Sequence, residues 1–390
     1  MAEEIVGFVE AANDIESVAM NKPVMLFDAR AITCKPCGVR NVAENYLVEF
    51  KEKYDIVAIV NVDAAALISL SIRKEVCSRY LSRFNPLSDL WVSLLVLRYR
   101  PKVFFSAHSF LPVLALLPKV RVFVCHDLFS VFDGNFFRKQ GLLSPLARMF
   151  FRILTELSFL RASVVITPSE AIAQTFDRLF VKAKKVLVVH NGINLTEVQD
   201  LSQPPCKQVL FVGNFRSYKG IDILLDAWHK FSQSSQGAEW SLAVVTNEPL
   251  PVVKRLQQVQ SELERVIFHS RISDEELAHF RKSSLIFVVP SRQEGFGIPL
   301  LEAIAAGGAV ICSDIPVFQE LLHDFNSTTI NTFETGSGSD LCQVLFKVVG
   351  QIVSSDLQAT LIKVNSENLY VLRKNYSWTA AADKVISGMQ

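Results

Sequence analysis

Half of the 390 residues are hydrophobic and a fifth are charged, which provides ample apolar surface for a large core. The length exceeds that of one ordinary core and favours two domains. The 40 basic and 39 acidic residues leave a net charge of +1, which argues against nucleic acid as the main partner.

The beginning of the chain carries no sign of a secretory signal. Residues 1–19 are acidic and lack a basic start, so we interpret them as an appended helix or as sequence upstream of a start at Met20. No stretch reaches about 18 uncharged apolar residues, so we expect no membrane-spanning helix. Seven cysteines without framework spacing fit a reducing cytosol, and we expect a cytoplasmic protein.

The first series of predicted strands alternates with helical periodicity in the N-terminal half. Its members are Val24–Phe27, Ile56–Val60, Val103–Phe105, Val120–Cys125, Val164–Ile166 and Val186–Val189. A second series follows with the same alternation. Its members are Val209–Val212, Leu242–Val245, Val266–Phe268, Ile286–Val289 and Ala309–Ile311. The pattern predicts an α/β fold with parallel sheets that helices cover on both faces.

Between the first two strands, Cys34-Lys35-Pro36-Cys37 has the C-x-x-C spacing of thiol oxidoreductases. No partner pair completes a zinc site, and no tryptophan stands beside the first cysteine. We therefore favour a loop with two free thiols and keep thiol redox chemistry as a minor alternative.

Residues 142–161 predict an amphipathic helix in which Arg148, Arg152 and Glu156 recur every four residues. Met149, Phe150, Phe151, Leu154 and Leu157 occupy its other faces. The favoured interpretation is a surface helix packed on its sheet. The alternative is peripheral attachment to an anionic membrane, at the inner face for a cytoplasmic protein.

A polar, proline-paired stretch over residues 198–208 separates the two series and is interpreted as an interdomain linker. We expect an N-terminal Rossmann-like domain over 1–200 and a C-terminal one over 201–375. A final helix over 376–390 is expected to cross back to the first domain. The carboxyl ends of both sheets are expected to face a cleft, where open α/β sheets bind ligands.

Residues 290–309 carry the strongest signal of function. The apolar run Leu285–Val289 predicts a buried strand, and Glu294 follows it in a loop broken by two glycines. Pro299 then suits the first turn of a helix, which carries Glu302 in its first turns. Free N–H groups at a helix start favour phosphate, and carboxylates accept hydrogen bonds from sugar hydroxyls. The segment therefore predicts a site for a phosphorylated, hydroxyl-rich ligand.

From about Phe27 to Met389 the chain resembles the family 4 retaining glycosyltransferases of the GT-B architecture. Glu294 and Glu302 match the E-x7-E signature within a P-S-x-x-E-G-F-G-x-P-x-L-E-A run. The other matching motifs, in chain order, are His126-Asp127-Leu128, Thr167-Pro168-Ser169-Glu170, His190-Asn191-Gly192, Phe211-Val212-Gly213 through Lys219-Gly220, Ser273-Asp274-Glu275-Glu276-Leu277, and Tyr376-Ser377-Trp378.

This resemblance implies roles for individual residues. Glu294 would hold the hydroxyls of the donor sugar, and Glu302 would accept a hydrogen bond from the nucleotide ribose. Lys219 would place positive charge beside the diphosphate leaving group, and His126 would lie against the donor sugar near the acceptor. The remaining expected donor-binding residues are Gly38, Gly213, Asn214, Ile272, Gly295, Phe296, Gly297, Ile298, Pro299 and Leu300.

Two positions depart from the pattern of the family. Many relatives carry arginine five residues before the lysine, where this chain has Asn214. Either Arg216, two residues later, supplies the charge and joins the catalytic set, or the leaving-group clamp is weaker. The first loop, through Gly38 and Arg40, contains one glycine and two cysteines where relatives are often richer in glycine.

The implied reaction is retaining transfer of a hexose from a nucleotide diphosphate sugar to a saccharide or lipid-linked saccharide. The motifs lean toward mannose and GDP-mannose, with UDP-hexoses left open. No D-x-D motif is present, so we expect no metal and no cofactor beyond the co-substrate. The alternative is a non-catalytic GT-B protein that binds a sugar nucleotide and acts as a partner or scaffold.

Overall fold

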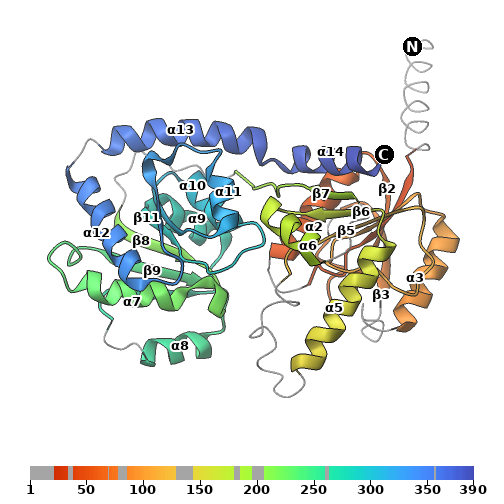
Figure 1. Cartoon of the computed structure of the whole chain (residues 1–390), viewed down its shortest axis with the longest axis horizontal. Helices are drawn as coiled ribbons and strands as arrows, with labels where there is room; N and C mark the ends of the chain where they lie inside the picture. Colours follow the sequence, from red (N-terminus) through yellow and green to blue (C-terminus); the bar gives the residue numbers. More distant parts are fainter. Residues whose placement is uncertain are drawn as a thin grey trace, which may run out of the picture. The chain divides into compact units, whose positions relative to one another are not determined.

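The computed structural model describes residues 22–33, 38–68, 70–77, 86–128, 144–179, 185–195, 206–259, 263–354 and 357–390. The chain divides into two compact units (Figure 1). Unit 1 comprises Met1–Pro168, Thr175–Val189 and Ala382–Gln390, and unit 2 comprises Ser169–Gln174 and His190–Ala381. Most of the expected linker lies outside the described residues, and the domain limits at 200 and 375 stay predictions.

Unit 1 is built on a parallel sheet whose seven described strands follow the order β3-β2-β1-β4-β5-β6-β7. The strands are β1 (Val24–Asp28), β2 (Asp55–Asn61), β3 (Arg73–Cys77), β4 (Val103–Ser106), β5 (Val120–Val124), β6 (Val164–Thr167) and β7 (Lys185–Val188). The helices are α2 (Gly38–Phe50), α3 (Pro86–Tyr99), α5 (Ser144–Arg161) and α6 (Glu170–Leu179), whose first residues belong to unit 2.

Unit 2 contains a second parallel sheet with the order β10-β9-β8-β11-β12-β13. The strands are β8 (Cys206–Val212), β9 (Ser241–Thr246), β10 (Val266–Ser270), β11 (Ser284–Val289), β12 (Ala309–Ser313) and β13 (Ile330–Phe333). The helices are η2 (Ser217–Lys219), α7 (Ile221–Ser232), α8 (Leu250–Val259), α9 (Asp274–Ser283), α10 (Ile298–Ala306), α11 (Pro316–Leu322), η3 (Ser327–Thr329), α12 (Gly338–Ser354), α13 (Leu357–Asn375) and α14 (Trp378–Met389). Residues of α14 from Ala382 onward belong to unit 1.

Alternating side chains bury both faces of each sheet. In β8, Val209 and Phe211 join one core with α7 and α12, while Leu210 joins the opposite core with α10. In β1, Leu26 packs into the core shared with α3 and α5, whereas Phe27 stacks on Phe105 of β4. The prediction of an α/β fold with two parallel-sheet Rossmann-like domains is confirmed.

All eleven predicted strands are present, and two strands escaped prediction. The sequence of β3, RKEVC, is mostly charged, and that of β13, INTF, is short and half polar. Both strands lie at an edge of their sheet, where only one neighbour is needed and polar side chains reach solvent. The apolar-run criterion therefore finds the central strands and the apolar edge strands β7 and β10, and it misses the two edge strands that are rich in polar residues.

The structure confirms a helix in the predicted segment 142–161 but corrects the orientation of its faces. Arg148 is half-buried, whereas Met149, Phe150 and Leu157 are exposed. The buried side comprises Thr155, Ser158 and Phe159, with Ser158 bonded to the backbone of Leu111. The outward face of α5 is thus mainly apolar and not a basic stripe.

Candidate functional site at the carboxyl edge of the second sheet

Both sheets reverse their strand order at one point. In unit 2 the chain moves outward from β8 to β9 and β10, then returns to β11 on the other side of β8. Ligands of open α/β sheets bind beyond the carboxyl ends of the strands at such a switch point. Because β8 and β11 are paired in parallel, the loops that follow them lie at the same edge.

Lys219 and Glu294 meet at this edge. Lys219 lies in η2 after β8, Glu294 lies in the loop after β11, and Lys219 Nζ is 2.6 Å from Glu294 Oε1. The Ser291 hydroxyl donates to the same Oε1 at 2.7 Å. The side chains of Lys219 and Glu294 are only 15% and 9% exposed, so little solvent screens the pair. The structure therefore brings together the two residues to which the sequence assigned leaving-group and sugar contacts.

The two loops are fixed to each other by close backbone packing. Gly220 has φ +69°, and a Cβ there would lie 1.9 Å from the carbonyl oxygen of Pro290. Position 220 therefore requires glycine, both because φ is positive and because the backbone of Pro290 leaves no room for a Cβ.

Arg292 adds side-chain bonds between the same loops. Its guanidinium bonds both carboxylate oxygens of Asp222 at 2.7 and 2.8 Å and the carbonyl oxygen of Ser217 at 2.7 Å. Sequence reasoning gave no role to Arg292 or Ser291. No local pattern identifies Arg292, because its partner Asp222 is 70 residues away.

The loop after Glu294 leads into α10 through Gly297, which has φ +106° and whose added Cβ would meet the buried ring of Phe318. The Leu300 N–H donates to the Gly297 carbonyl, and Pro299 has no N–H to offer. Within the described chain, the N–H groups of Gly297 and Ile298 donate to no protein acceptor. Among the expected donor-binding residues from Phe296 to Leu300, Leu300 therefore has its N–H already bonded at the start of α10.

The side chains of Phe296 and Leu300 are buried in the core, so only their backbones can face a ligand. Phe296 packs against the rings of His190 and Tyr376, and the Ser169 hydroxyl donates to the carbonyl of Gly295 at 2.9 Å. These contacts hold the loop that carries Glu294.

Glu302, in the second turn of α10, accepts a hydrogen bond from Arg281 of α9 at 2.7 Å. Ile272 precedes α9 and packs, half-buried, against the core that contains α10. Helix α9 itself begins with a capping box between Ser273 and Glu276, which accounts for the Ser-Asp-Glu-Glu motif as a helix start.

One of the two departures from the family pattern, Asn214, lies in the loop between β8 and Lys219. The N–H of Gly213 bonds the Val245 carbonyl at 3.0 Å, and Asn214 Oδ1 accepts the N–H of Arg216 at 3.2 Å. The Arg216 side chain is exposed and forms no ion pair with any described residue. Asn214 therefore shapes the loop, and Arg216 is available as a cation in solvent.

In unit 1, His126 follows β5 and lies at the carboxyl edge of the first sheet. Its Nε2 is 2.8 Å from the Ala107 carbonyl. A carbonyl oxygen only accepts, so Nε2 carries a proton. Gly38 begins α2, and a Cβ there would meet nothing within 4 Å. Cys34 and Cys37 lie outside the described residues, and the redox interpretation stays untested.

The Ala107 segment is held by a buried ionic cluster at the end of β1. Arg30 bonds both oxygens of Asp28 at 2.6 and 2.8 Å, and His108 Nε2 lies 3.5 Å from Asp28 Oδ1. Burial alone would raise the pKa of Asp28, but the charge and hydrogen bonds of Arg30, aided by His108, hold it well below its usual range.

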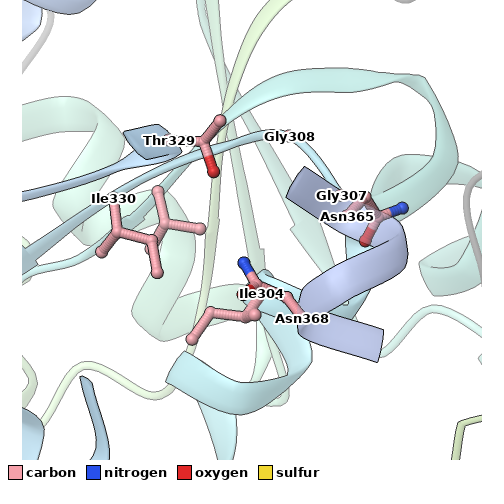
Figure 2. A pocket seen from close by; sticks show the side chains of 8 residues that line it. Ile304, Gly307, Gly308, Thr329, Ile330, Asn365 and Asn368 are labelled. Carbon is pink, nitrogen blue, oxygen red and sulfur yellow. The ribbon is translucent and has the colours of Figure 1, made fainter. Parts of the chain in front are cut away.

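Figure 2 shows a small pocket at the other end of α10. It is lined by Ile304, Gly307, Gly308, Val310, Thr329, Ile330, Asn365 and Asn368. Val310 and Ile330 lie near the amino ends of their strands, so this pocket is remote from the Lys219–Glu294 pair. The described ranges contain no group of three or more His, Cys, Asp or Glu residues that could hold a metal ion. The same ranges contain no helix that is both long and apolar enough to span a bilayer.

Two family models match consecutive parts of the chain. Residues 41–197 match the model described as Glycosyltransferase Family 4, and residues 197–336 match that of the group 1 glycosyl transferases. Among solved structures, Anabaena HepE in complex with UDP and glucose superposes with a TM-score of 0.70 at 15% identity, covering 94% of this chain and 99% of that one.

Curated relatives align over part of their length. The O-antigen chain mannosyltransferase RfbU of Salmonella typhimurium is 29% identical over 256 residues, covering 62% of this chain and 66% of the relative. The GDP-mannose:cellobiosyl-diphosphopolyprenol alpha-mannosyltransferase of Komagataeibacter xylinus is 28% identical over 196 residues, covering 48% of each chain. The aligned part thus spans about half to two thirds of these relatives.

The chain thus contains a Glycosyltransferase Family 4 domain followed by a group 1 glycosyl transferase domain. Its fold is that of the GT-B glycosyltransferases. The resemblance and the fold class inferred from the sequence are both confirmed.

Proposed function

We propose that this protein is a retaining hexosyltransferase that moves a sugar, with mannose favoured, from a nucleotide diphosphate to a saccharide or lipid-linked saccharide. The observation that carries the proposal is the Lys219–Glu294 pair. A cation and an acid meet with little exposure at the switch point of the second sheet, beside a helix start that offers two N–H groups.

Lys219 acts on the leaving group. As the bond from the anomeric carbon to the phosphate oxygen breaks, negative charge builds on the departing diphosphate, and a nearby ammonium stabilises it. With no donor bound, Glu294 holds that ammonium in place. When a donor enters, its phosphate becomes a second anion beside Lys219, and Glu294 accepts hydrogen bonds from the hydroxyls of the sugar. Arg216, exposed on the same loop, supplies a further cation for the diphosphate.

The amides of Gly297 and Ile298 receive the diphosphate, and Glu302 accepts the ribose hydroxyl while Arg281 orients its carboxylate. Gly213, Asn214 and Ile272 line the same edge of the second sheet. His126 is assigned to the acceptor side of the sugar, with Nε2–H held by Ala107. In the reaction that the family resemblance implies, the departing phosphate takes the proton of the attacking hydroxyl, so no side chain has to act as a strong base.

Two relatives are named as mannosyltransferases, one of them with GDP-mannose as donor, which supports mannose and GDP-mannose. The complex of HepE with UDP and glucose keeps UDP-hexoses as the alternative donor. The names of the same relatives support an acceptor in an O-antigen chain or on a polyprenol diphosphate. With such an acceptor the protein would act at the inner face of a membrane, and segment 142–161 would contact that membrane.

A non-catalytic sugar-nucleotide-binding protein is the second candidate, and Asn214 in place of the usual arginine favours it. A panel of nucleotide sugars distinguishes the two candidate functions. Each nucleotide sugar is tested first for thermal stabilisation of the protein and then as a donor in a transfer assay. A donor at 100 times its Kd adds about 2.7 kcal/mol of stability. Stabilisation with transfer supports the enzyme, stabilisation without release of nucleotide across an acceptor panel supports the binding protein, and no stabilisation by any nucleotide sugar contradicts both.

A further inference from the structure

Helices α3 and α5 cover the same face of the first sheet. Val92 and Leu95 of α3 and Phe159 of α5 are buried in one core with Leu26 and Phe104 of the sheet. The packing of unit 1 therefore accounts for the apolar residues on the inward faces of α3 and α5, the helices labelled in Figure 1. It does not account for the residues on their outward faces.

Those outward faces are apolar. On α3, the residues at spacings of three and four are leucines with exposed fractions of 57–62%, namely Leu87, Leu90, Leu94 and Leu97. On α5, a second stripe is exposed by 40–64% and comprises Leu146, Met149, Phe150, Ile153, Leu157 and Leu160. A surface helix of a globular domain normally turns polar residues outward, whereas α3 and α5 expose apolar residues as well as burying them.

The loop over residues 113–116 joins the two stripes into one surface. Toward α3, the N–H of Leu114 donates to Asp89 and that of Leu116 to Ser93, at 2.7 and 2.9 Å. Toward α5, the Arg161 guanidinium donates to the carbonyls of Val113 and Ala115. Leu114 and Leu116 themselves are 73% and 60% exposed. The three elements hold twelve of the twenty-one large hydrophobic side chains that are exposed in the described residues.

The charge of the segments that form this surface indicates which kind of partner it binds. Residues 86–121 and 144–161 contain eight Lys or Arg and two Asp or Glu, whereas the whole chain is nearly balanced. One of the two acids, Asp89, is buried and accepts the Leu114 N–H, and the other, Glu156, pairs with Arg152. Two of the eight cations are paired, Arg98 with Glu75 at 3.6 Å and Arg152 with Glu156, which still leaves these segments with an excess of positive charge. An apolar face on segments with excess positive charge matches the interface of an anionic bilayer. Two copies of the same face would repel each other.

We propose that the outward faces of α3 and α5 and the loop 113–116 form a docking surface for an anionic phospholipid bilayer. The leucines, Met149 and Phe150 enter the boundary between headgroups and acyl chains, and the arginines and lysines at the edge contact lipid phosphates. This proposal extends the suggested contact of segment 142–161 to two further elements and does not depend on which sugar is transferred.

The test is co-sedimentation of the full chain with vesicles. Vesicles of phosphatidylglycerol and phosphatidylcholine are compared with vesicles of phosphatidylcholine alone, at 0.1 and 1 M salt. The test variant is Leu94→Gln/Leu114→Gln/Met149→Gln, one exposed residue from each element. The matched control is Leu250→Gln/Ile267→Gln/Val353→Gln, three similarly exposed hydrophobic residues of unit 2.

We expect the wild type and the control to bind anionic vesicles at least ten-fold more tightly than neutral ones at 0.1 M salt. The test variant should lose at least ten-fold in binding, and 1 M salt should weaken binding by the wild type because screening shortens to about 3 Å. Circular dichroism and transfer to a water-soluble acceptor should stay unchanged in the test variant. Equal binding to both vesicle types, equal binding by the wild type and the test variant, or a dimer that the test variant dissociates without vesicle binding would each overturn the proposal.

Discussion

Lys219→Met tests the site through the stability of the free protein. The change removes the ammonium 2.6 Å from Glu294 and leaves a carboxylate that is 9% exposed, with the Ser291 hydroxyl as its remaining partner among the described residues. A hydrogen bond to a charged group contributes about 1.5–3 kcal/mol, so we expect a loss near the upper end of that range, about 2–3 kcal/mol. Adding Glu294→Gln should recover about half of the loss, because no unpaired charge then remains.

Urea unfolding of the two single variants and the double variant measures this coupling. Lys230→Met is the matched control, since Lys230 forms an exposed pair with Asp226 at 3.7 Å and should lose less than about 1 kcal/mol. Strictly additive effects of Lys219→Met and Glu294→Gln would show that the pair is not coupled in solution. In turnover, Lys219→Met should cost about 10²–10³-fold in kcat as leaving-group stabilisation is lost. If Lys219→Met kept the wild-type kcat, leaving-group stabilisation would have to be assigned to Arg216.

Three further outcomes follow from the described contacts. Glu302→Gln should raise the KM for the nucleotide sugar about ten-fold with little change in kcat, since ribose binding is the same before and during transfer, and an equal fall in kcat would contradict that role. Gly220→Ala should destabilise the protein by more than about 2 kcal/mol, whereas Gly336→Ala, also at positive φ but with open space, should cost only about 1 kcal/mol in thermal unfolding. Asp28→Asn should cost about 3–5 kcal/mol at pH 7 because Arg30 stays buried and charged. Because the pKa of Asp28 is lowered in the folded protein, its contribution to the free energy of unfolding is complete above pH 4. Below pH 4 this contribution declines by about 1.4 kcal/mol per pH unit. The difference in free energy of unfolding between wild type and Asp28→Asn should therefore be flat from pH 8 to 5 and smaller at pH 3.

The sequence predicted central strands well because their apolar runs are set by burial on both faces. Edge strands β3 and β13 were missed because one neighbour and open solvent permit charged and polar residues there. Helix α5 was found by its periodicity, yet its outward face was misjudged. The prediction assumed that the charged residues of α5 face solvent, but its exposed residues are mainly apolar.

Within the candidate site, Glu294 and Lys219 were named from motifs that are 75 residues apart, but their ion pair was not foreseen. That pair follows from the return of the chain to β11 beside β8, which is a property of the strand order and not of either motif. Arg292 and Asp222 likewise become partners only through this topology. The engagement of the Leu300 N–H depends on α10 starting at Ile298, which puts Pro299 in the first turn as predicted and Gly297 within reach of the Leu300 N–H.

The central claim is that Glu294 and Lys219 form the donor half of a sugar-transfer site. The most direct measurement is the rate at which the purified chain releases nucleoside diphosphate from GDP-mannose and UDP-glucose with an acceptor panel, compared with Glu294→Gln. We expect acceptor-dependent release by the wild type and a loss of at least 10²–10³-fold in the variant, whose thermal stabilisation by GDP or UDP persists. Release at the wild-type rate by Glu294→Gln would contradict the claim.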